Sequence, residues 1–160
     1  PEPMAQRPMR DLIAAHPVFR DFDESTLDLL AGCARNEHFP AGASIFREDD
    51  PVDRLYILRE GDVAIEIATP ERAPLVVETL HAGDLVGWSC MVPPHRAISD
   101  ARAVSDVRAT SLDAACVRGK CDDNPVLGYR MFQHWMPHLA RRMQAMRLQL
   151  ADLYGRPGTV

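Results

Sequence analysis

The chain has 160 residues, the length of one domain, and its 46% of hydrophobic residues can build a core, so wholesale disorder is excluded. Its formal net charge is −5 at pH 7, whereas a nucleic-acid-binding domain usually carries a basic face. We therefore expect one globular domain that makes no direct contact with nucleic acid.

The sequence predicts no attachment to a membrane. No apolar run reaches the roughly 18 residues of a membrane span. Residues 1–15 lack the apolar stretch of a signal peptide. We therefore expect a cytoplasmic protein without membrane contact. In that compartment the cysteines should be reduced thiols. They are Cys33, Cys90, Cys116 and Cys121.

The first elements are expected to be helices. Residues 8–36 have helical apolar spacing, which Pro17 interrupts. Asp23 is the expected N-cap of a second helix, because a short acceptor side chain stands just before an apolar periodic run. We expect residues 1–9 to be a flexible N-terminus and residues 10–37 to hold the N-terminal helices of the domain.

From His38 the apolar residues alternate instead. Short alternating segments follow one another at about eight to ten residues, each closed by glycine or aspartate. They are residues 44–46, 55–59, 63–67, 75–79 and two strands within 101–112. This spacing predicts an antiparallel roll or sandwich, which we place at residues 38–113.

The last part of the chain is expected to be helical again. Asn124 and Pro125 form an N-cap and a first helical position, and apolar residues at spacings of three and four then make one stripe. Pro137 should kink or split this helix. The predicted fold class is mainly β with flanking helices, a double-stranded, jelly-roll-like β-roll. Its long C-terminal helix falls within residues 114–154, with a tail at 155–160.

Four motifs occur in order along the chain. They are Phe39-x-x-Gly42-x-x-Ile45-Phe46, Asp53-x-Leu55-Tyr56-Ile57-Leu58-x-Glu60-Gly61-x-Val63, Leu80-x-x-Gly83-Asp84-x-Val86-Gly87 and Ala140-Arg141-Arg142-Met143-Gln144. Together they resemble the cyclic nucleotide-binding domain family, the sensor domain of catabolite-activator and FNR-type bacterial regulators. The resemblance covers residues 10–154 and implies a single sensor domain that forms a homodimer through its C-terminal helix. Since the chain ends soon after that helix, we expect no helix-turn-helix domain.

The resemblance places the family's phosphate-binding cassette at residues 86–97, where this sequence departs from the family pattern. In the family a glutamate accepts a hydrogen bond from the ribose hydroxyl, and an arginine pairs with the cyclic phosphate. Trp88 stands at the glutamate position, and an indole is a donor only. Arg96 lies one residue early for the arginine, and Met146 and Arg147 replace hydroxyl residues that contact the base.

The ligand that the resemblance implies is a cyclic nucleotide, cyclic AMP or cyclic GMP, or another small anion suited to an arginine fork and to N–H groups at a helix start. No other cofactor is implied. The candidate ligand-binding residues are Val86, Gly87, Trp88, Ser89, Cys90, His95, Arg96, Ala97 and Arg147. The leading hypothesis is a regulatory module that senses this ligand and signals through its C-terminal helix.

Two other hypotheses stay open. In one, the roll is degenerate, Trp88 fills the pocket and the surface docks a protein partner; an open cavity beside Arg96 would favour sensing instead. The weaker one is a thiol or metal redox sensor that uses Cys90 or the pair Cys116 and Cys121. The sequence has no GxSxG, Walker A or HExxH motif and no His-x-His pair, so we expect no catalytic residue, metal site or enzyme.

Overall fold

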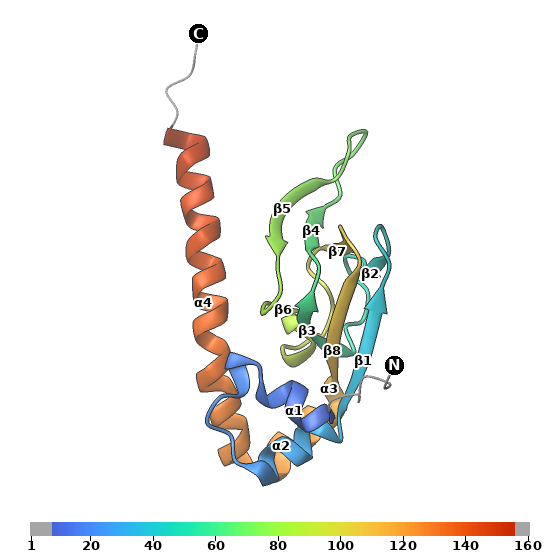
Figure 1. Cartoon of the computed structure of the whole chain (residues 1–160). Helices are drawn as coiled ribbons and strands as arrows, with labels where there is room; N and C mark the ends of the chain where they lie inside the picture. Colours follow the sequence, from blue (N-terminus) through green and yellow to red (C-terminus); the bar gives the residue numbers. More distant parts are fainter. Residues whose placement is uncertain (1–7, 156–160) are drawn as a thin grey trace.

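The structure, a computed structural model, describes residues 8–155. They form a β-roll, a group of short helices at one end of the roll and a long helix at its side (Figure 1). Two four-stranded antiparallel sheets, ordered β1-β8-β3-β6 and β2-β7-β4-β5, make the roll. The strands are β1 (Ala34–Phe39), β2 (Ser44–Phe46), β3 (Arg54–Glu60), β4 (Val63–Ile67), β5 (Leu75–Leu80), β6 (Leu85–Val86), β7 (Asp100–Ala103) and β8 (Val107–Asp113). The predicted fold class is confirmed.

Two of the helices begin at the caps that the sequence predicts, Asp23 and Asn124. The helices are α1 (Met9–Ala14), η1 (Pro17–Phe19), α2 (Glu24–Ala31), η2 (Trp88–Met91), α3 (Ala114–Asp123) and α4 (Pro125–Gly155). The carboxylate of Asp23 accepts a hydrogen bond from the N–H of Thr26 at 2.8 Å and so caps α2. α4 continues through Pro137, so the predicted split does not occur. A proline removes a single backbone donor, and the turns on either side keep theirs. No helix formed by residues 8–155 is long and apolar enough to cross a membrane.

The first strand begins earlier than the sequence predicts. Residues 34–36 were expected to be helical, but they belong to β1, which pairs with β8 from Ala34 opposite Leu112 to Phe39 opposite Val107. The start of β1 is polar and carries no alternation of apolar residues, so it gives no local strand signal. Pairing with a distant strand decides its conformation.

Two clusters of buried side chains hold these elements together. One fills the roll with residues of both sheets: Leu58, Val63, Ile65, Leu80, Val86, Ala101, Ala103, Val107 and Ala109. The other joins the end of the roll to the helices and includes Ile13, Val18, Phe19, Leu30, Leu55, Leu112, Val117, Leu127 and Met131. Of α4, the described buried members are Leu127 and Met131, with Trp135 packed against them. The rest of α4 runs along the side of the roll, past β5 (Figure 1).

A disulfide fastens the helical end of the domain. It joins Cys33, just before β1, to Cys116 in α3, with Cα atoms 5.7 Å apart and a sequence separation of 83. The prediction of reduced thiols is wrong for these two residues, because the pairing of β1 with β8 brings them together. Cys121, which sequence spacing had grouped with Cys116, lies with its Sγ 3.7 Å from the sulfur of Met131 instead.

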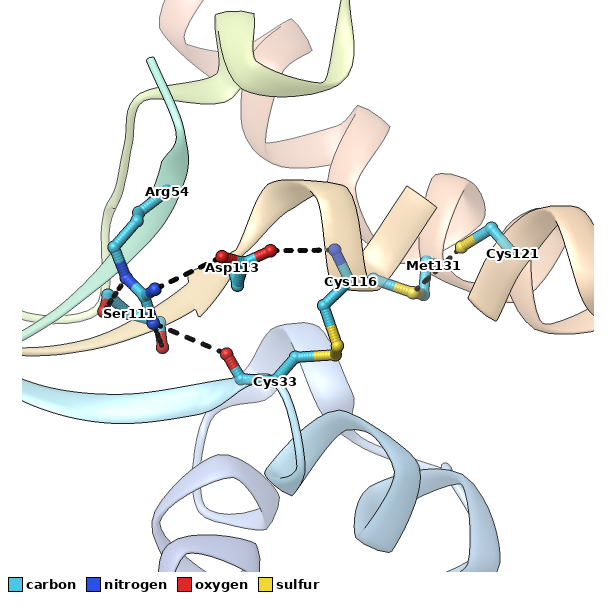
Figure 2. Close-up of a disulfide and its surroundings, with 7 residues drawn as sticks. All are labelled: Cys33, Arg54, Ser111, Asp113, Cys116, Cys121 and Met131. Carbon is cyan, nitrogen blue, oxygen red and sulfur yellow. Dashed lines mark hydrogen bonds and ion pairs between the residues drawn. A yellow bond between two sulfur atoms is a disulfide. The ribbon is translucent and has the colours of Figure 1, made fainter. Parts of the chain in front are cut away.

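Polar bonds surround this disulfide and tie three elements to it (Figure 2). The guanidinium of Arg54 in β3 donates to the hydroxyl of Ser111 at 2.6 Å and to the carbonyl of Cys33 at 3.5 Å. It also lies 3.6 Å from the carboxylate of Asp113. Asp113 is the N-cap of α3 and accepts from the N–H of Cys116 at 2.8 Å. Hydrogen bonds and an ion pair therefore link strands β3 and β8 and helix α3 beside the disulfide.

Candidate functional site: a cavity between the roll and α4

A cavity of about 680 Å³ lies between the sheet β2-β7-β4-β5 and α4. Small-molecule sites generally have volumes of this order. The roll lines it with Phe46, Ile65, Ile67, Leu75, Val76, Val77, Glu78, Gly87, Trp88, Ser89, Ile98 and Ser99. The long helix lines it with Met136, Leu139, Ala140, Arg142, Met143, Met146, Gln149 and Leu150. An occupant would therefore touch the roll and the helix at the same time.

Gly87 shapes one end of this cavity. Its backbone φ of +88° is left-handed, and a Cβ at this position would lie 2.9 Å from the carbonyl oxygen of Arg54. A side chain is therefore excluded both by backbone strain and by space. The turn at Gly87 leads from β6 into η2 and places Trp88, which is half-buried, on the cavity wall. Trp88 forms part of the wall and leaves the cavity open.

The nine residues expected to bind ligand fall into three groups in the structure. The cavity lining includes Gly87, Trp88 and Ser89. The hydrophobic clusters hold Val86, Cys90 and Ala97. The described lining does not include His95, Arg96 or Arg147. Of the candidate residues in the cassette segment, those near its start, Gly87 to Ser89, therefore line the cavity.

Backbone pairing turns Arg96 away from this wall. Residues 95–97 run beside residues 49–52, and the N–H of Asp49 donates to the carbonyl of Ala97 at 2.9 Å. The exposed side chain of Arg96 donates through Nη1 to the carbonyl of Asp49 at 2.6 Å. An open cavity beside Arg96 was the feature expected to favour sensing over docking. The cavity is open, but it lies beside Trp88 and not beside Arg96.

The charged side chains on the described wall, Glu78 and Arg142, bind each other. Nε and Nη2 of Arg142 donate to the two carboxylate oxygens of Glu78 at 2.8 and 3.0 Å. Nη1 donates to the carbonyl of Leu85 at 3.0 Å. The two side chains are 16% and 17% exposed. This bidentate pair links β5 to α4. Sequence reasoning placed Arg142 in a motif of the helix but assigned neither residue to the site, because their partnership exists only in the fold.

The remaining thiols are not activated. Cys90 is buried outside the cavity lining, and burial raises the pKa of its thiol to about 12, although the guanidinium of Arg118 acts in the other direction. A thiol with this pKa stays protonated at neutral pH and is a poor nucleophile. Within residues 8–155, no group of three or more His, Cys, Asp or Glu side chains is placed to hold a metal ion. Nothing in the described site therefore favours the redox hypothesis.

Known proteins resemble this chain in sequence and in fold. The family model for the cyclic nucleotide-binding domain matches residues 36–124. A CRP-like cAMP-activated global transcriptional regulator of Mycobacterium tuberculosis is 28% identical over 145 residues, which make up 91% of this chain and 63% of that protein. A cyclic nucleotide-binding domain from Methylobacillus flagellatus has a TM-score of 0.76 at 17% identity, over 95% of this chain and 84% of that one. The Thermus thermophilus Catabolite Activator Protein has a TM-score of 0.65 at 22% identity, over 86% of this chain and 63% of that one.

These findings confirm the resemblance that the four motifs suggested. They do not support the expectation that the chain makes no direct contact with nucleic acid, since the Mycobacterium tuberculosis relative is a transcriptional regulator. That expectation came from net charge, which averages over a chain and cannot exclude a local contact. The chain spans less than two thirds of that relative's length. The Mycobacterium tuberculosis relative is named as a regulatory protein, and the two structures, at 17% and 22% identity, show the shared fold.

Proposed function

Because the chain belongs to the cyclic nucleotide-binding domain family, we propose that it is a sensor module in which a small molecule between the roll and α4 sets the position of α4. The shared wall of the cavity carries this proposal. A ligand shifts a conformational equilibrium only as far as its contacts differ between the two states. An occupant that touches Trp88 on the roll and Leu139 on the helix loses contacts when the helix moves away.

The packing of α4 supports a helix that can move at one end. The anchored part of α4, residues 125–135, contributes Leu127 and Met131 to a hydrophobic cluster. The outer part, residues 136–150, contributes no buried residue to either cluster. Its described contacts with the roll are the cavity wall and the bonds of Arg142 to Glu78 and to the carbonyl of Leu85. A ligand can therefore change the balance of a weakly packed segment without opposing a core.

The first ligands to test are those of the family. The Mycobacterium tuberculosis relative is named as cAMP-activated, so cyclic AMP and cyclic GMP are the first ligands to test against this cavity. The residues proposed to meet the ligand, whatever its class, are Gly87, Trp88 and Ser89, which line the cavity. The open cavity beside Trp88 supports sensing over the docking hypothesis, which required the indole to fill it.

Trp88 provides the test of ligand entry. The chain has two tryptophans, and the indole N–H of Trp135 has no hydrogen-bond partner among the described residues, so W135F loses no such bond. In W135F, a ligand in the cavity should change the fluorescence of Trp88 and slow amide hydrogen exchange in residues 136–150. A fluorescence change without a change in exchange would contradict coupling to α4. No response to any nucleotide or apolar ligand would contradict the sensor proposal altogether.

We also propose that α4 forms the seam of a homodimer. One long helix presents many exposed apolar side chains, which a monomer rarely shows in number. Those outside the cavity lining include Val126, Tyr129, Phe132 and Leu148. Sedimentation equilibrium should give a dimer for the unchanged chain and a monomer for F132E, since a charge would be buried in the seam without a partner. A monomer for the unchanged chain would contradict the seam.

A further inference from the structure

We infer that the occupant of this cavity is an uncharged, largely apolar small molecule and not a cyclic nucleotide or another anion. The inference rests on the proposed sensor function, because it concerns the ligand of the same cavity. Apolar side chains from both sides make up most of the wall. The principal ones are Phe46, Ile65, Leu75 and Trp88 from the roll and Leu139 and Met143 from α4. Such a wall favours a ligand whose own surface is apolar, because binding removes apolar surface of both from water.

The ion pair on the wall disfavours an anion. Glu78 and Arg142 are mostly buried and satisfy each other through two bonds, and Arg142 also donates to the carbonyl of Leu85. A phosphate at this place would have to displace the carboxylate of Glu78 or remain unpaired beside it. Either arrangement leaves a charge in apolar surroundings without its partner, which is unfavourable. An uncharged ligand leaves the pair intact.

Two of the groups that the sequence suggested for an anion, the N–H of Cys90 and the guanidinium of Arg96, are engaged elsewhere. The N–H of Cys90 donates to the carbonyl of Gly87 at 3.1 Å and so completes the turn of η2. The guanidinium of Arg96 donates to the carbonyl of Asp49 and lies outside the described lining. Ser89 remains on the wall but offers an anion no positive charge, and the cation on the wall, Arg142, is already paired with Glu78.

The helix side of the wall suits an apolar ligand of irregular shape. Three methionines, Met136, Met143 and Met146, line the cavity from α4 and are 42%, 57% and 40% exposed. Methionine is unbranched and polarizable, so it adapts to an apolar surface better than branched residues do. An occupant would cover these exposed side chains, and the gain from their burial would draw the outer part of α4 onto the roll.

N-phenyl-1-naphthylamine is a suitable probe, because it is uncharged at neutral pH and fluoresces in apolar surroundings. The full chain should bind it saturably and independently of salt between about 0.05 and 0.5 M. Excess cyclic AMP should not displace it. A140W places a large side chain in the cavity and should weaken binding at least about tenfold, or 1.4 kcal/mol. A145W is the matched control, since Ala145 is exposed on α4 outside the lining, and it should bind as the unchanged chain does.

A second measurement does not depend on how A140W folds. In W135F, the emission of Trp88 should transfer to the bound probe, because the two would share the cavity. Equal binding by A140W and A145W together with no transfer from Trp88 would overturn the inference.

Displacement of the probe by cyclic AMP, or nucleotide binding that A140W abolishes, would overturn the apolar ligand class and leave the sensor proposal standing. Probe binding with unchanged exchange in residues 136–150 would support the ligand class and overturn the sensor proposal. Failure of both the probe and the nucleotides to bind would overturn both.

Discussion

The anchored and outer parts of α4 carry apolar residues at the same helical spacing but use them differently. In the anchored part, Leu127 and Met131 are 3% and 2% exposed and pack into the cluster at the end of the roll. In the outer part, Met143 and Leu148 are 57% and 70% exposed. A stripe of apolar residues therefore reveals a helix but not what covers it. In this chain, one part of the helix fixes its place and the other remains available to a ligand or a second copy.

The largest expected effect separates the two parts with one kind of substitution. M131A removes a fully buried side chain and should lower the free energy of unfolding by about 2–5 kcal/mol, because it leaves a cavity that the core cannot close. M143A removes the same atoms from an exposed position and should change the free energy of unfolding by no more than about 0.5 kcal/mol. Urea unfolding at equal protein concentration measures both. Equal losses would show that the two parts are held alike.

Loss of the disulfide should loosen the anchored part next. The double substitution C33S/C116S opens a loop of 83 positions and should cost about 2–4 kcal/mol of stability, with the unfolded chain gaining most of the freedom. Hydrogen exchange should quicken in α3 and residues 125–135 and stay unchanged in residues 136–150. C121S is the control, since that thiol is half-buried and makes no disulfide. Uniform quickening along α4 would mean that the two parts unfold together.

The parts of the fold that could be predicted depend on neighbours a few positions apart. Asp23 caps α2 through an N–H three residues away, and the strands of the roll alternate within their own length. The disulfide and the start of β1 could not be predicted in this way, because both follow from the pairing of β1 with β8. No local pattern marks Cys33 and Cys116 as partners.

The candidate site divides along the same line. Gly87, Trp88 and Ser89 follow one another at a turn that a short motif identifies, and all three line the cavity. The direction of Arg96 depends on the pairing of residues 95–97 with residues 49–52, which spacing along the chain does not reveal. The ion pair on the wall likewise joins two elements that only the folded chain brings together.

The ion pair gives a smaller effect that should fall on the outer part alone. E78Q leaves the guanidinium of Arg142 without its charged partner and should cost about 1–2 kcal/mol, less than for a fully buried pair because some water reaches it. Exchange in residues 136–150 should quicken, while residues 125–135 keep their protection. E48Q is a matched control, since Glu48 is exposed and makes no ion pair among the described residues. Equal hydrogen exchange in residues 136–150 of E78Q and E48Q would show that the ion pair does not hold the outer part of α4 to the roll.

The smallest expected effect concerns a histidine at the border of the two parts. The ring of His16 accepts at Nδ1 from the N–H of Val18 and bonds through Nε2 to the carbonyl of Gly83 at 2.7 Å, and its centre lies 6.2 Å from that of His138. Burial lowers the pKa of His16 below its ordinary 6.5, and His138 lowers it further, while Gly83 and Asp84 act in the other direction. The neutral ring fits this bonding pattern, because Nδ1 must accept.

The sign of the pH effect follows from this lowered pKa. The unfolded chain takes up a proton at about pH 6.5 and the folded chain only at lower pH, so the contribution of His16 to stability is present above about pH 6.5 and lost as the pH falls through the folded value. His81 acts oppositely, since its hydrogen bond to Asp62 raises its pKa. H16Q keeps a side-chain donor for Gly83 and cannot titrate. The difference in free energy of unfolding between the unchanged chain and H16Q therefore isolates the titration of His16, because the contributions of the other titratable groups cancel. The advantage of the unchanged chain over H16Q in urea unfolding should shrink between about pH 7 and pH 5. A difference that stays constant over that range would mean that His16 holds the border through packing and not through its neutral ring.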